Sequence, residues 1–113
     1  MPFIKTATTE KIDEKMQREL TRELGQAITL IPGKSEHWLM LKFEGGADMA
    51  FRGSTLPCAM VEADLYGSAD AAALDALTAR VTEILSSHLG IDPERIYVRY
   101  LSTPDWGYAG SNF

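Results

Sequence analysis

The order of strand-like and helix-like apolar patterns along the sequence constrains the fold of this chain more than any other feature. A short apolar stretch at residues 2–7 is followed, at residues 10–31, by apolar side chains that recur every four residues. This spacing places them along one face of a helix, whereas short alternating stretches indicate strands. Pro32-Gly33 then marks the helix end, and a strand pattern returns at residues 37–43. The first part of the chain therefore predicts a β-α-β unit.

The same order of patterns is found a second time. Residues 58–66 alternate apolar and polar side chains, residues 70–89 carry another helical apolar stripe, and residues 96–101 give a fourth strand pattern. The remaining tail is rich in glycine and aromatic residues. Thr8 and Thr9 precede the first helical stretch and are its candidate N-caps.

These two units predict the fold class. We expect an α+β fold in which two β-α-β units form a four-stranded mixed sheet with two helices on one face. The opposite face of that sheet would be bare in a single copy. A bare sheet face favours self-association, although the order of elements alone names no function.

Length, composition and charge fit a single domain over residues 1–113. The chain is 45% hydrophobic and 24% charged, with a net charge of -5 and its 11 basic residues scattered. This distribution argues against nucleic acid or a membrane as the partner.

Cys58 is the only cysteine, which excludes an internal disulfide and fits a reducing compartment. No signal-peptide core and no apolar run of ~20 residues is present, so we expect a cytoplasmic protein.

Several local stretches together resemble a known family. The chain starts with Met1-Pro2 before an apolar strand, and Gly33-Lys34 follows the first helix. Residues 49–59 read Met-Ala-Phe-Arg-Gly-Ser-Thr-Leu-Pro-Cys-Ala, and residues 92–97 read Asp-Pro-Glu-Arg-Ile-Tyr. Together they are similar to the macrophage migration inhibitory factor branch of the tautomerase superfamily. The likeness covers nearly the whole chain and is weakest in the tail. It implies a homotrimer and a catalytic N-terminal proline.

The chemistry of Pro2 can also be argued from the residue itself. An initiator methionine before proline is commonly removed, which leaves a secondary amine at the N-terminus. An ordinary α-amino group titrates near pH ~8, and burial or a nearby cation lowers that pKa. Such an amine can be neutral at physiological pH and act as a general base. Without the resemblance, Pro2 reads as a rigid strand start.

The resemblance assigns roles to two further residues. Lys34 matches a lysine beside the N-terminal proline, where it would bind a substrate carboxylate or enolate and lower the proline pKa. Tyr97 matches a tyrosine that a neighbouring subunit contributes to the pocket. Taken alone, Lys34 reads as a solvated lysine and Tyr97 as a core aromatic residue on a strand.

Other candidate residues surround this core of the site. Arg99 stands where the mammalian protein has asparagine, and it shares a strand face with Tyr97, so it is either a pocket cation or a partner in a surface or intersubunit salt bridge. The second thiol of the mammalian Cys-x-x-Cys is absent after Cys58, which argues against thiol–disulfide chemistry. The predicted substrate-binding residues are Phe3, Trp38, Tyr66, Arg99, Trp106, Tyr108 and Phe113.

The remaining motifs are weak. His37 and His88 lack the ligand spacing of a metal site, and His88 fits a helix end, where a cation suits the helix dipole. Gly45-Gly46 has no phosphate-binding context, and Ser54 has no recognisable catalytic partners.

The resemblance therefore predicts a cofactor-independent keto–enol tautomerase of small aromatic 2-oxo acids, with phenylpyruvate as the probe substrate. One alternative is a related proline-dependent decarboxylase, hydratase or dehalogenase of small acids, which Arg99 keeps open. Another is a cytokine-like signalling protein with a vestigial pocket. Such a protein would be released by a non-classical route, because the mammalian relative leaves cells without a signal peptide.

Overall fold

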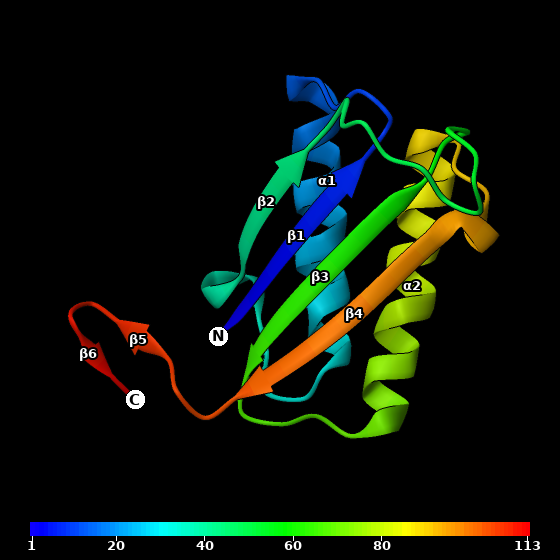
Figure 1. Ribbon diagram of the computed structural model, residues 1–113. Coiled ribbons are helices and arrows are strands. Elements are labelled where there is room, and N and C mark those ends of the chain that lie inside the picture. Colours follow the sequence, from blue (N-terminus) through cyan, green and yellow to red (C-terminus); the bar gives the residue numbers. More distant parts are fainter.

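The computed structural model describes residues 1–113 and contains a four-stranded sheet with the order β2-β1-β3-β4. Both helices cover the same face of this sheet (Figure 1). A short hairpin, β5–β6, follows the last long strand. The elements are β1 (Pro2–Thr8), α1 (Glu14–Ala27), β2 (Met40–Glu44), β3 (Ala59–Tyr66), α2 (Ala71–Leu89), β4 (Ile96–Thr103), β5 (Gly107–Tyr108) and β6 (Ser111–Asn112).

The pairing of the strands confirms the predicted fold class. β1 pairs with β2 in parallel, β3 pairs with β4 in parallel, and β1 joins β3 in antiparallel fashion. Each long helix therefore connects two parallel strands along the chain, and the antiparallel pair of β1 and β3 makes the sheet mixed. Neither helix has the length and the apolar character that crossing a membrane requires.

The face of the sheet beneath the helices forms the hydrophobic core. Along β3, Val61, Ala63 and Leu65 are buried, as the alternating pattern predicts. Ile4 of β1 joins them, and Leu85 of α2 packs in the same cluster. Burying a large aliphatic side chain contributes about 1.5–3 kcal/mol, so this layer supplies most of the favourable energy of the fold.

The start of α1 differs from the expectation. The N-cap is Asp13, whose carboxylate accepts a hydrogen bond from the Met16 amide at 2.8 Å. The prediction that Thr8 or Thr9 caps this helix is wrong, because their hydroxyls are engaged elsewhere. Thr8 donates to the Cys58 carbonyl at 2.8 Å, and Thr9 accepts from the Cys58 amide at 3.1 Å. The two threonines thus tie β1 to the start of β3.

The boundaries of the second strand and of the tail also differ. β2 begins only at Met40, because Glu36–Trp38 form a turn of 3-10 helix where the sequence pattern predicts strand. The tail folds back as the β5–β6 hairpin, closed by a hydrogen bond from the Phe113 amide to the Trp106 carbonyl at 3.0 Å. Figure 1 shows this hairpin on the side of the molecule where β1 begins. Both changes place aromatic residues near the N-terminus.

The other face of the sheet is open and carries a row of charges. Lys5 lies 3.5 Å from Glu62 and 3.7 Å from Glu44, and Lys42 lies 3.5 Å from Glu44. Arg99 completes the row with a 2.7 Å contact to Glu62. Large apolar side chains flank these charges and are exposed: Met40, Tyr97 and Leu101.

Candidate functional site

A cavity of about 500 Å³ lies where β1 begins. The first strand supplies its floor, the 3-10 turn before β2 supplies one wall, and the tail hairpin supplies another. This volume suits a small organic molecule. Its lining residues are Met1, Pro2, Phe3, His37, Trp38, Leu39, Met40, Trp106, Gly107 and Tyr108.

Aromatic rings from distant parts of the chain gather around this cavity. The rings of Trp38 and Tyr108 meet edge to face with centroids 5.0 Å apart, and Tyr108 stacks on Phe113 at 6.2 Å. Tyr66, at the end of β3, contacts Phe113 at 5.4 Å. Pairs of this geometry contribute about 0.5–1.5 kcal/mol beyond their burial, so the hairpin is held against the body of the protein.

Lys34 lies beside the N-terminus of the chain. Its Nζ donates a 2.6 Å hydrogen bond to the Tyr66 carbonyl, and the Tyr66 amide donates to the Met1 carbonyl at 3.0 Å. Burial lowers the pKa of the Met1 amine below its ordinary value of 8.0, and the Lys34 ammonium lowers it further through its charge and through hydrogen bonding. The site therefore favours a neutral amine at the N-terminus.

Pro2 is buried at the first position of β1, directly opposite Leu65 of β3. While Met1 is attached, the Pro2 nitrogen is a tertiary amide and has no proton-accepting lone pair. Removal of Met1 would turn the same nitrogen into a secondary amine, one residue from the position where burial and Lys34 lower the pKa of the Met1 amine.

Two predicted site residues lie elsewhere in the chain. Pro2 pairs with Leu65, and Leu65 pairs with Ser102 of β4. Ser102 therefore lies in the same row across the sheet as Pro2. Tyr97 precedes Ser102 by five residues on β4, which places it about 17 Å from this row along the strand, at a rise of about 3.3 Å per residue. Arg99 shares the open face with Tyr97 and is paired with Glu62.

The structure thus divides the predicted residues into three groups. Pro2, Phe3, Trp38, Trp106 and Tyr108 line the cavity. Lys34, Tyr66 and Phe113 adjoin it through their contacts with the N-terminus and the hairpin. Tyr97 and Arg99 lie on the open face and do not line the cavity of their own chain.

Sequence reasoning missed five lining residues: Met1, Gly107 and the three neighbours of Trp38, which are His37, Leu39 and Met40. His37 stacks edge to face on Trp38 at 4.8 Å. The pattern of residues 37–43 predicts a continuous strand, which would have placed His37, Leu39 and Met40 on two faces of the sheet. The break before Met40 brings them to one cavity, and no local signal distinguishes this short turn from a strand. No group of three His, Cys, Asp or Glu side chains is arranged to hold a metal ion.

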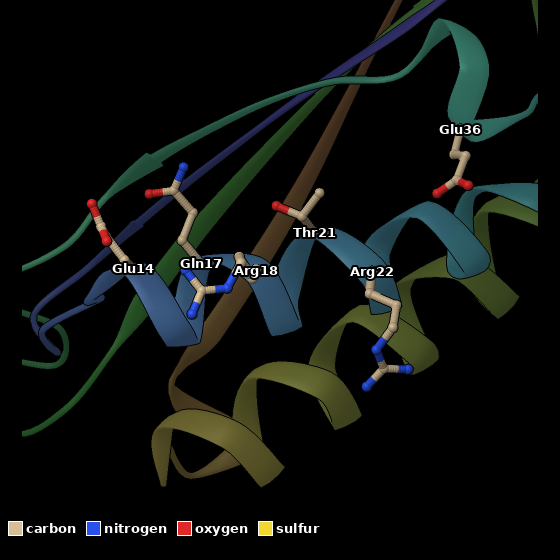
Figure 2. Close-up of a pocket in the computed structure, with 6 residues that line it drawn as sticks. All are labelled: Glu14, Gln17, Arg18, Thr21, Arg22 and Glu36. Atoms are coloured by element: carbon tan, nitrogen blue, oxygen red, sulfur yellow. The ribbon is translucent and has the colours of Figure 1, made fainter.

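A second hollow, of about 570 Å³, runs along the outer face of α1. Figure 2 shows that its charged side chains do not converge, because the Arg22 guanidinium points away from both Arg18 and Glu36. No hydrophobic residue lines it, so it has the character of a solvated helix face. Its lining residues are Glu14, Gln17, Arg18, Thr21, Arg22 and Glu36.

Comparison with known proteins decides the family. The family model of macrophage migration inhibitory factor matches residues 1–113. The chain belongs to the macrophage migration inhibitory factor family. This family is part of the tautomerase superfamily.

Two curated members of the family show the extent of the likeness. D-dopachrome decarboxylase of Gallus gallus is 29% identical over 107 residues, which cover 94% of this chain and 90% of that protein. Macrophage migration inhibitory factor of Meriones unguiculatus is 29% identical over 104 residues, which cover 90% of this chain and 87% of that protein. The match therefore extends over most of both proteins.

Solved structures of the family share the fold. The crystal structure of Leishmania major MIF2 superposes with a TM-score of 0.94 at 32% identity and covers 100% of this chain and 97% of that chain. The homologue from Prochlorococcus marinus gives a TM-score of 0.82 at 27% identity, with 98% of each chain covered. The fold of the macrophage migration inhibitory factor family thus accounts for the whole chain.

Proposed function

We propose that this protein is a cofactor-independent keto–enol tautomerase of small aromatic 2-oxo acids, with Pro2 as its general base and acid. The observation that carries the proposal is the meeting of three features at the start of β1. These are a cavity floored by Pro2, aromatic walls, and the Lys34 cation beside an N-terminal amine whose pKa is lowered. Family membership supports the same chemistry.

In the proposed reaction, the neutral Pro2 amine accepts a proton from the enol hydroxyl and returns it to the adjacent carbon. The proton moves from oxygen to carbon, the carbon–carbon double bond becomes a single bond while the carbon–oxygen bond becomes a carbonyl, and no atom is gained or lost. The Lys34 ammonium binds the substrate carboxylate by a charge-assisted hydrogen bond. The aromatic ring of the substrate stacks against Trp38 and Tyr108. Burial and the nearby Lys34 charge, which lower the pKa of the Met1 amine, would favour the neutral form of a Pro2 amine in the same way, so that it can accept the proton near neutral pH.

We further propose that a neighbouring copy completes the site within a homotrimer. Tyr97 is about 17 Å from the level of Pro2 along the sheet of its own chain, so it can serve only the cavity of another copy. The exposed apolar residues around the charge row, Met40, Tyr97 and Leu101, give the open face the character of an interface.

A decarboxylase is the second candidate function, and the avian relative of that name favours it. Decarboxylation by the same proline would use an additional cation to stabilise the enolate that remains when the carboxylate leaves as carbon dioxide. Arg99 is the candidate for this role, but within the chain its guanidinium is neutralised by Glu62 at 2.7 Å. This pairing makes tautomerisation the better-supported reaction.

The experiment begins with the intact mass of the purified protein, which we expect to correspond to a chain without Met1. Phenylpyruvate is then assayed in the enol-to-keto direction. Pro2→Gly should remain folded by circular dichroism and lose most of the activity. A matched variant with one alanine inserted between Met1 and Pro2 keeps the proline but makes its nitrogen an amide, and it should be equally inactive. Turnover at the wild-type level in either variant would contradict the general-base role.

A further inference from the structure

Arg95, in the 3-10 turn before β4, makes more hydrogen bonds to the backbone than any other side chain of the protein. Its Nε donates to the Pro57 carbonyl at 2.9 Å, and its Nη1 donates to the Phe51 carbonyl at 3.1 Å. Its Nη2 donates to Ser54 at 3.1 Å and to Leu56 at 2.9 Å. One planar guanidinium thus holds four carbonyls of the segment 51–57. Lysine could not reproduce this arrangement, because it presents one compact ammonium instead of a fork.

The segment that Arg95 holds is tightly turned. Phe51 and Ser54 exchange backbone hydrogen bonds of 2.9 and 3.0 Å across the turn. Arg52 and Gly53 both have positive φ, of 52° and 72°. A residue other than glycine in this region costs about 1 kcal/mol or more, so the turn depends on contacts from outside it. The Arg95 fork provides these contacts.

The turn brings the Phe51 ring into contact with Arg95, with Tyr97 and with its own neighbour Arg52, whose guanidinium lies 5.1 Å from the ring centroid. The Arg95 guanidinium lies over the ring at 5.2 Å from its centroid. The Tyr97 ring also meets Phe51, edge to face, with centroids 5.0 Å apart and planes at 88°. Tyr97 is 60% exposed, so burial in its own chain does not fix the orientation of its ring. Phe51 supplies that orientation instead.

We propose that Arg95 is a positioning residue for Tyr97, acting through the segment 51–57 and the Phe51 ring. Arg95 itself touches neither the cavity nor the predicted substrate. The Arg95 guanidinium fixes the position of Phe51, and the Phe51 ring fixes the orientation of the Tyr97 side chain on β4. The effect on catalysis rests on the proposed function, in which Tyr97 enters the site of a neighbouring copy. The effect on the orientation of Tyr97 does not depend on it.

The first test reads the orientation of Tyr97 without activity. The 4 tyrosines are replaced by 3-fluorotyrosine in the full-length protein, and the Tyr97 fluorine resonance is assigned with Tyr97→Phe. Arg95→Lys should shift and broaden this resonance, because the ring loses its fixed neighbour. Phe51→Leu, which keeps the arginine, should do the same even if Arg95→Lys folds poorly. Arg80→Lys is the matched control, since Arg80 pairs with Glu23 and Glu83 on the helix layer and should leave the resonance unchanged.

The second test is a double-mutant cycle on phenylpyruvate turnover. A small misplacement of a group in the site can cost up to ~100-fold, so Arg95→Lys should lower kcat/KM by about 10-fold or more. In the Tyr97→Ala background the same change should have less than about a 2-fold effect, because a residue that acts through Tyr97 has nothing left to position. An effect of equal size in both backgrounds would overturn the positioning role in catalysis.

The outcomes separate this inference from the proposed function. An unchanged Tyr97 resonance in both Arg95→Lys and Phe51→Leu would overturn the inference, whatever the activity. A shifted resonance together with full activity of Tyr97→Ala would support the positioning of Tyr97 and would remove Tyr97 from the proposed site.

Discussion

The two faces of the sheet are built from alternate residues of the same strands, yet they differ in almost every physical property. On β1, Ile4 is buried under the helices, whereas its neighbour Lys5 lies on the open face among carboxylates. On β3, Val61 is buried in the core, whereas Glu62 pairs with Lys5 and Arg99. Apolar side chains dominate the covered face, whereas the open face combines paired charges with exposed apolar side chains.

The difference separates the residues that stabilise the chain from those that we propose to assemble it. The covered face provides the burial that folds the chain. The charge row of the open face contributes little, because its ion pairs are partly exposed. In the proposed trimer, the open face serves association, and it brings Tyr97 of one copy toward Pro2 of another. Stability and assembly should therefore respond to substitutions on different faces.

The largest effect is expected for a pair of neighbours on β1. Ile4→Ala leaves a cavity in the core and should lower the free energy of unfolding by about 2–5 kcal/mol. Lys5→Ala removes only partly exposed ion pairs and should change it by less than about 1 kcal/mol. Chemical denaturation of both variants measures the difference. Similar costs for the two would contradict the division between the faces.

Charge added to the apolar part of the open face should prevent assembly. Met40 and Leu101 lie at the two ends of one row across the sheet. The double change Met40→Lys and Leu101→Lys should leave the chain folded but reduce its sedimentation mass from trimer to monomer at micromolar concentration. Leu30→Lys is the control, because Leu30 is also exposed but lies after α1, and it should keep the trimer. A trimer that survives the double change would show that the open face is not the interface.

Lys34→Ala should reduce kcat/KM by about 10- to 150-fold, which corresponds to the loss of one charge-assisted hydrogen bond. The loss should be greater at low pH. A nearby positive charge disfavours the protonated amine, so its removal raises the pKa of the N-terminal amine and leaves less neutral base below that pKa. The pH dependence of kcat/KM checks this. Lys42→Ala, which removes an exposed lysine of β2, should leave the profile in place.

The smallest effect concerns two threonines of the covered face. The Thr6 hydroxyl is buried without a hydrogen-bond partner, whereas the Thr8 hydroxyl donates to the Cys58 carbonyl and accepts from the Glu10 amide at 3.2 Å. Thr6→Val should therefore raise the free energy of unfolding by about 1 kcal/mol, and Thr8→Val should lower it by a similar amount. Thermal unfolding of the two variants gives the sign of each change. Equal signs would contradict this assignment of the hydroxyl contacts.

Alternation and helical spacing were enough to predict the fold, because both depend on local geometry. The assignment of Val61 to the covered face and of Glu62 to the open face follows from the two-residue period of a strand alone. The ends of elements could not be predicted in this way. Thr8 and Thr9 look like helix caps, but their hydroxyls bond to residue 58, which lies far away in the sequence.

The candidate site was predicted in part. The resemblance supplied Pro2 and Lys34, but the contact that holds Lys34, with the carbonyl of Tyr66, depends on how the loop after α1 meets the end of β3. Arg95 resembles an ordinary surface arginine in the sequence. Its role became visible only when the fold placed four carbonyls of a distant turn around it.

The most direct test of a site shared between copies is a mixing experiment with Pro2→Gly and Tyr97→Ala. Each variant alone should have little activity, because every site lacks one of the two residues. When the two are refolded together in equal amounts, about a quarter of the sites in random trimers should regain both residues from neighbouring copies. We expect phenylpyruvate turnover to recover to that level. A mixture that stays as inactive as its components would contradict a site shared between copies.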